Sequence, residues 1–213
     1  MSGLIKLGVA AVLIFGIFGI WRYVTAPTDS GSVSGGALLD LTDKDWVRGA
    51  SDAPVTLIEY TDFQCPACGA YYPIIEQLSK EFEGKLKFVV RHYPLMQIHP
   101  NALGAARAAE AAGRQEKFWD MYHLLYTNQN EWSVASDPMK SMFPAYASQI
   151  GLDVERFRQD MTDATLDDKI TNDRKTGNEL EITGTPSFFL NGKKLESPRS
   201  LEEFQQVIKA AIK

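Results

Sequence analysis

Cys65 and Cys68 are the two cysteines among the 213 residues, and Pro66 and Ala67 separate them. A single pair this close cannot form the disulfide framework of a small secreted domain. The pair follows an apolar run and precedes a helix-like segment. In that arrangement one thiol can react while the other resolves the product. The pattern therefore predicts thiol–disulfide exchange at Cys65 and Cys68.

Cys65 is the expected nucleophile of the pair. At the N-terminus of a helix, the backbone N–H groups and the helix dipole favour an anion. This environment lowers the pKa of a thiol, and the thiolate is the form that attacks a disulfide. Cys68 lies one helical turn further on, close enough to bond Cys65 and expected to be more deeply buried. We therefore expect Cys68 to be the resolving thiol.

Two other interpretations of the cysteine pair stay open at the level of the residues. A permanent disulfide is one, although closing so short a loop removes little entropy from the unfolded chain. A zinc site is the other, with two of His92, His99 and His123 completing four ligands. A lone C-x-x-C lacks the second cysteine pair of a zinc knuckle, so we expect no metal and no bound cofactor.

The segments around the cysteines predict a strand, a helix and a second strand. Pro54–Tyr60 is a strand-like run, and Lys85–Arg91 is the next one. Between them, Pro66 stands at the first helical position, where its missing N–H costs nothing, and the helix continues to about Phe82. Two strands and a helix within about 40 residues predict a right-handed βαβ unit.

The second half of the chain predicts a helical block followed by a hairpin and a helix. From 100 to about 180 the hydrophobic pattern is helical throughout. Asn191-Gly192 is a strong two-residue turn signal between the short strands Ser187–Leu190 and Lys193–Leu195. A capping box at Ser200–Glu203 opens a last helix that ends near Ile212. The expected order is βαβ, a helical insertion, then ββα.

The N-terminus differs in character from the rest of the chain. We interpret 1–24 as a transmembrane anchor or a signal, 25–36 as a flexible linker, and 37–213 as the folded domain. Leu7–Trp21 is uncharged, and Lys6 and Arg22 flank it; if both snorkel, the span reaches the length of a bilayer core. We favour an uncleaved single-pass anchor with an extracytoplasmic domain, and secretion after signal cleavage is the alternative.

The charge balance argues against nucleic-acid binding. The chain has 22 basic and 27 acidic side chains, which gives a net charge of −5. Proteins that bind nucleic acids need a basic face to neutralise phosphates. The sequence also contains no phosphate-binding loop and no glycine motif for a dinucleotide.

Together, several motifs resemble the DsbA family of thioredoxin-fold thiol–disulfide oxidoreductases. The cysteine pair opens a helix, Pro73 follows eight residues after Cys65, and Gly184-Thr185-Pro186 precedes a strand. The runs DAPVTLIEYTDFQCPAC, HPNALGAARAAEAA and ITGTPSFFLNG are similar to membrane-anchored or exported bacterial members. The resemblance implies an α/β thioredoxin fold with an inserted helical subdomain at about 97–180. It also implies disulfide introduction or exchange in exported proteins.

The same resemblance suggests roles for residues around the cysteines. Glu59 matches the family's buried acid, which accepts a proton from the resolving thiol, and Arg91 or His92 on the next strand could pair with it. Thr185-Pro186 matches the cis peptide bond beside the disulfide, where the Thr185 backbone is free to pair with an extended substrate. Pro66 and Ala67 shape the site and tune its potential, which we expect between about −270 and −120 mV.

The resemblance also implies partners. These are exported proteins with thiols or disulfides and a DsbB-like membrane quinone reductase or another redox partner, and we expect a monomer. Two alternatives to an oxidase remain. One is a reductase or isomerase of the same fold, which fits Thr185 before the proline; the other is a binding or chaperone module without turnover.

Overall fold

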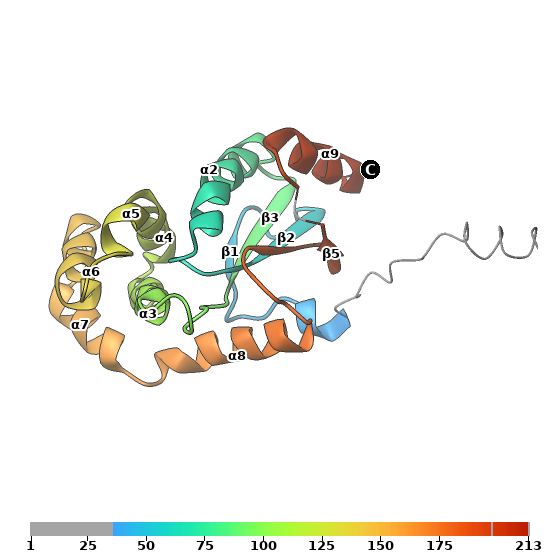
Figure 1. Ribbon diagram of the computed structural model, residues 1–213. Helices are drawn as coiled ribbons and strands as arrows, with labels where there is room; N and C mark the ends of the chain where they lie inside the picture. Colours follow the sequence, from blue (N-terminus) through green and yellow to red (C-terminus); the bar gives the residue numbers. More distant parts are fainter. Residues whose placement is uncertain (1–35, 197, 213) are drawn as a thin grey trace, which may run out of the picture. The chain divides into compact units, whose positions relative to one another are not determined.

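A five-stranded mixed sheet lies at the centre of the structure, a computed structural model that describes residues 36–196 and 198–212 (Figure 1). The strands lie in the order β1-β3-β2-β4-β5. The central strands β2 and β3 are parallel, whereas the other neighbouring pairs are antiparallel. The strand bounds are β1 Trp46–Arg48, β2 Val55–Thr61, β3 Leu86–His92, β4 Ser187–Leu190 and β5 Lys193–Leu195.

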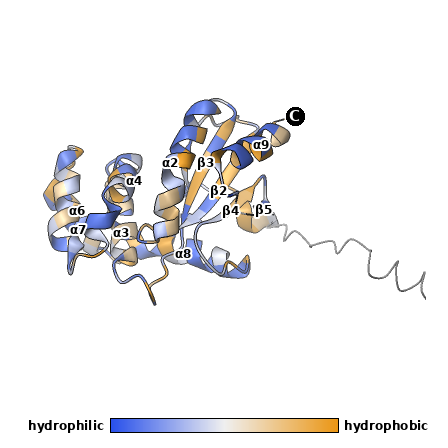
Figure 2. Ribbon diagram, turned by 45° about the horizontal axis from the view of Figure 1, so that its top comes forward, coloured by the Kyte–Doolittle hydropathy of each residue, from blue (hydrophilic) through white to orange (hydrophobic). Residues whose placement is uncertain are grey.

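The two central strands are buried on both faces. All residues of β2 except Thr56 and all residues of β3 except Lys87 are buried. A parallel pair covered on both sides reads as a nearly continuous apolar run, which is the pattern that predicted these strands. Figure 2 shows the hydrophobic colouring of this central region. Within that run, Glu59, Arg91 and His92 are buried polar residues.

Helices cover both faces of the sheet. On one face lie α2 (Pro66–Glu81) and α9 (Leu201–Ala211), and on the other lies α8 (Leu166–Glu179) (Figure 1). Alternate β2 residues serve the two layers, because successive side chains of a strand point to opposite faces. Leu57 belongs to the core beneath α2 and α9, whereas Tyr60 belongs to the core beneath α8. Gly177 lets α8 approach closely, since a Cβ there would lie 2.7 Å from the Tyr93 ring.

A helical insertion separates β3 from β4, as expected. Its first helix, α3, contacts α4, α6, α7 and α8, and its small alanine side chains allow neighbouring helices to approach. Figure 1 shows α3 to α7 gathered beside the sheet. The bounds are α3 Ala102–Gly113, α4 Phe118–Thr127, α5 Gln129–Trp132, α6 Pro138–Gln149 and α7 Val154–Thr162.

Local details differ from the expectations. β1 and the short α5 were not predicted, since three or four residues are too few to show a period. Within the stretch expected to be helical throughout, the chain leaves the helical conformation before α4 begins at Phe118, because Glu116 has a φ of 62°. A short 3₁₀ helix, η1 (Gly36–Leu39), precedes β1.

The expected anchor at 1–24 lies outside the described residues, and so does all of the expected linker except Gly36. Among 36–196 and 198–212, none of the helices combines the length and the apolar character needed to span a bilayer.

Candidate active site

The cysteine pair lies where β2 leads into α2. A turn over Asp62–Gln64 follows the strand, and Cys65 is the N-cap of the helix. The backbone N–H of Cys65 donates to the Asp62 carbonyl over 3.0 Å, and the Gly69 N–H donates to the Cys65 carbonyl over 3.1 Å. Both cysteines are thiols, with Cys65 7% exposed and Cys68 1% exposed. The two thiols therefore differ in access to a partner.

The two thiols also differ in acidity. A hydrogen bond from Cys68 is the main cause that lowers the pKa of Cys65 to about 5. Burial opposes this shift, while Thr185 and the backbone N–H groups of Cys68 and Ala67 add to it. Burial raises the pKa of Cys68 well above its usual value, and the hydrogen bond to Cys65 and the charge of Glu59 raise it further. The expected assignment of nucleophile and buried partner fits this asymmetry.

Glu59 lies on the central strand β2 and is 1% exposed. Burial raises the pKa of its carboxyl to about 7, the hydrogen bond from Thr61 opposes the shift, and the Cys65 charge adds to it. Thr61 Oγ1 donates to Glu59 Oε1 over 2.8 Å. Within the described part of the chain, Glu59 Oε2 is buried without a hydrogen-bond partner. A carboxyl with a pKa near neutrality can take up or release a proton during a reaction.

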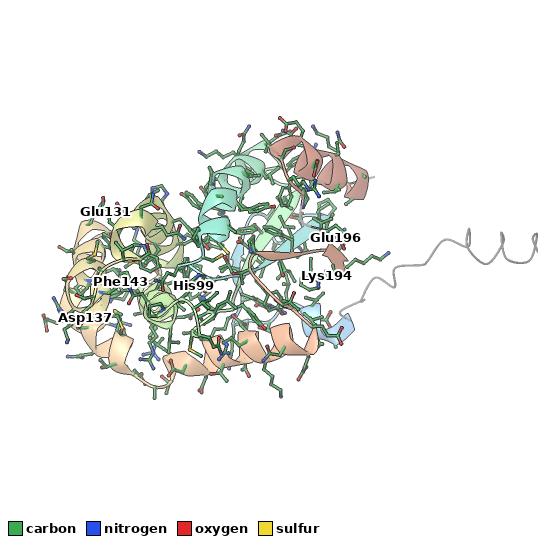
Figure 3. All side chains as sticks on the ribbon, in the orientation of Figure 1. His99, Glu131, Asp137, Phe143, Lys194 and Glu196 are labelled. Atoms are coloured by element: carbon green, nitrogen blue, oxygen red, sulfur yellow. The ribbon has the colours of Figure 1, made fainter. Side chains whose placement is uncertain are left out.

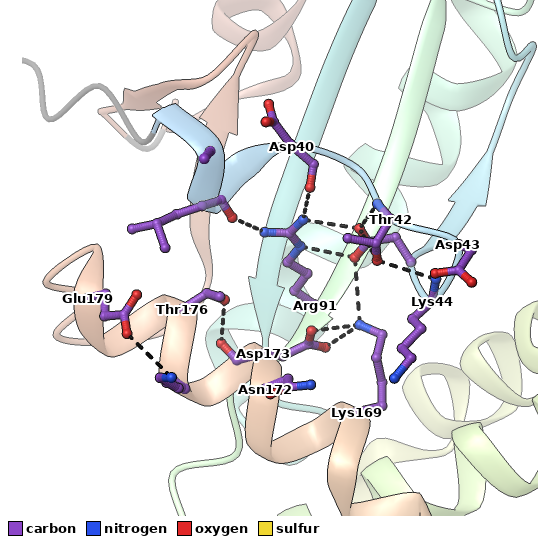
Figure 4. A pocket seen from close by; sticks show the side chains of 14 residues that line it. Asp40, Thr42, Asp43, Lys44, Arg91, Lys169, Asn172, Asp173, Thr176 and Glu179 are labelled. Atoms are coloured by element: carbon purple, nitrogen blue, oxygen red, sulfur yellow. Dashed lines mark hydrogen bonds and ion pairs between the residues drawn. The ribbon is translucent and has the colours of Figure 1, made fainter.

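Neither Arg91 nor His92, the two residues suggested as partners of Glu59, pairs with it in the described structure. Arg91 binds both carboxylate oxygens of Asp45, each over 3.0 Å, in a cluster that also contains Lys169 and Asp173 (Figure 4). The reason is strand alternation: Val90 is the β3 residue opposite Glu59, so Arg91 points to the other face.

His92 shares the Glu59 face of the sheet but is engaged elsewhere. Its Nε2 lies 2.7 Å from Glu110 Oε1 of α3, and the same oxygen accepts a hydrogen bond from Trp46 Nε1. The carboxyl group that pairs with His92 is therefore that of Glu110 and not that of Glu59.

Thr185 and Pro186 come to the cysteine pair from the start of β4. Their peptide bond is cis, which confirms the expectation. The Cys65 thiol lies 3.4 Å from the Thr185 carbonyl oxygen and donates to it. The Thr185 hydroxyl is buried with no partner among the described residues. Once Cys65 ionises it can no longer donate, and this hydroxyl is then available to donate to the thiolate.

Gln129 of α5 holds the active-site turn and was not anticipated. Its Nε2 donates to the carbonyls of Phe63 (2.7 Å) and Cys65 (2.9 Å). Gly69 leaves room for it, since a Cβ at Gly69 would lie 2.3 Å from Gln129 Oε1. The contact could not be predicted from local sequence patterns, because Gly69 and Gln129 are 60 residues apart. The glycine itself was the one signal in the sequence that another group approaches α2 closely.

Asp62 and Gln64 tie the same turn to the helical insertion. Asp62 carboxylate oxygens accept from Gln64 N (2.7 Å) and Leu95 N (2.9 Å), and one lies 2.7 Å from His99 Nδ1. His99, labelled in Figure 3, lies on the loop between β3 and α3. The Gln64 side chain accepts from Asn101 N over 2.6 Å and donates to the carbonyl of Ser133 over 2.8 Å. The polar side chains beside Cys65 thus fasten the turn to its surroundings.

The described residues do not assemble a metal site. None of their His, Cys, Asp and Glu side chains form a group of three or more that could hold an ion. The three histidines bond to separate partners: His92 to Glu110, His99 to Asp62, and His123 to Tyr72. This arrangement disfavours the zinc interpretation, which needed two of them beside the cysteines.

The sequence and the fold match known proteins. A family model described as "Thioredoxin" matches residues 41–210. Alpha-DsbA1 of Wolbachia pipientis superposes with a TM-score of 0.72 at 25% identity, covering 84% of this chain and 96% of the other. BdbD of Bacillus subtilis gives 0.70 at 22% identity, covering 79% and 93%. The expected resemblance to DsbA-type proteins and the thioredoxin fold with its helical insertion are confirmed.

Curated relatives with higher identity bear a different name. The Na(+)/H(+) antiporter NhaA 3 of Salinispora tropica is 38% identical over 170 residues, which are 80% of this chain. The match covers 25% of that relative. The chain thus spans about a quarter of the length of the curated relatives that it matches.

Proposed function

Because this chain belongs to the thioredoxin family, we propose that it is a thiol–disulfide oxidoreductase of the DsbA type that works through Cys65 and Cys68. The observation that carries the proposal is the inequality of the two thiols at the start of α2. Cys65 is the more accessible thiol and has the lowered pKa, whereas Cys68 is buried with a raised pKa. A permanent disulfide would need no such inequality.

The proposed reaction starts from the disulfide form of the pair. A substrate thiolate attacks Cys65 Sγ, the Cys65–Cys68 bond breaks, and Cys68 leaves as a thiolate that takes up a proton. Glu59 is the proposed source of that proton. The second substrate thiolate then attacks the substrate sulfur of the mixed disulfide, and Cys65 leaves as a thiolate. The substrate dithiol is oxidised by two electrons and the cysteine pair is reduced.

The acidity of Cys65 sets the preferred direction. A low-pKa thiolate is a good leaving group, so mixed disulfides at Cys65 break readily. Hydrogen bonds from Cys68 and Thr185 stabilise the reduced form, and a pair with a stabilised reduced form is an oxidant. We therefore favour disulfide introduction over the reductase and isomerase alternatives.

Thr185 and Pro186 are the proposed docking point for the substrate backbone. An extended segment can pair with the main chain beside Pro186, which is a form of β-strand addition. Pro66 and Ala67 are exposed next to Cys65, so they would contact the same segment. Neither carries a charge, so substrate sequence preference would come from elsewhere in the site.

We also propose that the domain acts outside the cytoplasm, tethered by the apolar segment at 1–24. An oxidising compartment is where a disulfide-forming enzyme has substrates. A DsbB-like quinone reductase is the proposed oxidant that regenerates the disulfide. The relatives named as Na(+)/H(+) antiporters are long proteins of which this chain matches a quarter, and we take no antiport activity from that name.

The test of the function is trapping in cells. In Cys68→Ala, the Cys65 thiolate attacks a substrate disulfide, one substrate sulfur leaves as a thiolate, and no Cys68 thiol remains to release the mixed disulfide. Substrates should therefore remain attached at Cys65 and be released by reductant. Cys65→Ser is the matched control and should trap nothing. Thiol alkylation of the wild type then reports direction: a mainly disulfide state supports the oxidase, and a mainly dithiol state supports a reductase. Full function of Cys65→Ser would instead support the binding module.

A further inference from the structure

A chain of buried hydroxyl groups leads from α4 to Glu59. Thr61 Oγ1 donates to Glu59 Oε1 over 2.8 Å, and the Tyr126 hydroxyl lies 2.6 Å from the same Thr61 oxygen. Glu59 and Thr61 stand two positions apart on β2, so they share a face of the sheet. A hydroxyl has one proton to donate. While Thr61 donates to Glu59, it must accept from Tyr126.

We propose that Thr61 and Tyr126 are positioning residues for Glu59, which hold its carboxyl in one orientation for proton exchange with Cys68. This inference rests on the proposed function, since Glu59 needs to be held for that exchange only if Cys68 gains and loses protons in turnover. In the described structure, the side-chain hydrogen bonds of Thr61 and Tyr126 join them to each other and to Glu59, not to the sulfur atoms of the cysteines. Both act through Glu59.

The hydroxyl chain assigns different tasks to the two oxygens of Glu59. Oε1 is held by Thr61, whereas Oε2 is buried without a partner among the described residues. A proton that arrives at Oε2 leaves the Tyr126–Thr61–Glu59 chain unchanged, while a proton at Oε1 would require Thr61 to turn round. Oε2 is therefore the oxygen that takes up and releases the proton.

The other charged and titratable groups around Glu59 come from α2, β1, α4 and β3. Cys65 and Cys68 face it from the start of α2, Arg48 from the end of β1, and Tyr122 from α4. His92 on β3 lies opposite Thr61 in the sheet and is bonded to Glu110.

Of these neighbours, Arg48 favours the charged carboxylate, whereas Cys65 disfavours it. Thr61 is the group that favours it through a hydrogen bond, against the burial that raises the Glu59 pKa. Removing the Thr61 hydroxyl should therefore raise that pKa further, because a carboxylate loses more than a neutral carboxyl when a donor is removed.

The experiment measures the titration of Glu59 directly, by carboxyl ¹³C NMR of the reduced full-length protein, with the signal assigned by Glu59→Gln. Thr61→Val removes the hydroxyl at nearly constant shape and should raise the midpoint by about one pH unit. Thr61→Ser should restore it. Tyr126→Phe keeps the ring that stacks on Tyr72 and should raise the midpoint by less.

The chain offers a matched control on the opposite face of β2. The hydroxyls of Thr176 and Tyr60 lie 2.8 Å apart, a second Thr–Tyr pair that does not involve Glu59. Thr176→Val therefore removes a comparable hydroxyl and should leave the Glu59 midpoint in place. A purely structural role for Thr61 would make the two threonine variants alike in this measurement.

A Glu59 midpoint that moves by less than about 0.2 unit in both Thr61→Val and Tyr126→Phe would overturn the inference. Equal shifts in Thr61→Val and Thr176→Val would do the same. The pH profile of disulfide exchange should move with the NMR midpoint. A protein that shows the expected midpoint shift but no disulfide exchange would contradict the proposed function alone. A protein that exchanges disulfides but whose Glu59 midpoint is unchanged by Thr61→Val would contradict the positioning role alone.

Discussion

Cys65 and Cys68 are chemically identical side chains that the protein places in unequal surroundings. The N-terminus of α2 and the hydroxyl of Thr185 favour a thiolate at Cys65, and burial beside Glu59 disfavours one at Cys68. The hydrogen bond between them acts in opposite directions on the two pKa values, because it stabilises the Cys65 thiolate with the Cys68 proton. Well above pH 5, these surroundings favour one negative charge in the reduced pair, on Cys65, the less buried of the two sulfurs.

The first residue-scale prediction concerns the titration of Cys65. In the reduced protein, the rate of alkylation by iodoacetamide should rise with pH around a midpoint near 5, the lowered pKa of Cys65. Cys68→Ala should move the midpoint upward, since it removes the hydrogen bond that contributes most. In Cys65→Ser the reactivity at low pH should disappear. A midpoint near that of an ordinary thiol, about 8.5, would contradict the account.

A second prediction concerns the stability cost of Glu59. Its folded pKa is raised from 4.5 to about 7, so the folded state binds more protons than the unfolded state between these values. The stability that this proton uptake gives the folded state is therefore fully present below pH 4.5 and is lost as the pH rises through 7. The free energy of unfolding of Glu59→Gln, relative to that of the wild type, should therefore rise by up to about 3 kcal/mol as the pH increases from 4 to 8.

Urea unfolding of the reduced wild type and Glu59→Gln at pH 4, 6 and 8 checks this cost. Disulfide exchange by the variant should be slower at every pH, although it remains folded. A stability difference that does not change with pH would show that Glu59 is not a buried titrating group.

At the scale of elements, the active-site turn is held by segments that are distant in the sequence. β2 and α2 place the cysteines, the segment directly before β4 contains the cis Thr185-Pro186 bond, and the Gln129 side chain of α5 binds the turn. Gln64 ties the turn to α3 and to the segment after α5. The helical insertion therefore holds the active-site turn in place through these hydrogen bonds.

The contact between α2 and α5 gives an element-scale prediction. Gly69→Ala places a Cβ in the space of Gln129 Oε1 and should displace the amide from the carbonyls of Phe63 and Cys65. The expected loss is about 1–3 kcal/mol of unfolding free energy. In a Gln129→Ala background the same substitution should cost much less. A double-mutant cycle by denaturant unfolding measures the coupling, and additive effects of the two substitutions would contradict this packing.

At the scale of the whole molecule, the buried ionic cluster of Arg91, Asp45, Lys169 and Asp173 stabilises the fold and lies apart from the cysteine site. Arg91 donates from Nε and Nη2 to the two carboxylate oxygens of Asp45, and it also donates to the carbonyls of Leu38 and Asp40. These bonds fasten the segment from η1 to β1 onto the face of the sheet opposite Glu59. The pocket beside this cluster has a volume of about 480 Å³, and Lys169 and Asp173 of α8 line it (Figure 4).

A substitution of Arg91 tests whether the Arg91–Asp45 cluster is independent of the cysteine site. Arg91→Ala leaves the Asp45 carboxylate buried without its main partner and should cost roughly 3–5 kcal/mol of stability. Adding Asp45→Asn should recover part of that loss. The Cys65 alkylation midpoint should stay where it is in the folded fraction, because Arg91 lies on the other face of the sheet. A shift of that midpoint by about a unit would show that the Arg91–Asp45 cluster and the cysteine site communicate.

The order of the main elements and the cysteine turn could be predicted from the sequence because each has a local signal. Pro66 marks the start of α2, and Asn191-Gly192 marks the turn between β4 and β5. The cis bond at Thr185 was expected from a motif whose meaning depends on the family. The partners of Arg91 and the position of Gln129 were not predictable, because they depend on strand alternation and on contacts between distant segments.

The most direct test of the central claim is a redox titration of Cys65 and Cys68. The protein is equilibrated in glutathione buffers, quenched with an alkylating agent and weighed by mass spectrometry. The account predicts a reversible two-electron change between dithiol and disulfide, with a potential between about −270 and −120 mV. Thiols that form no reversible disulfide, or a potential outside this window, would contradict it.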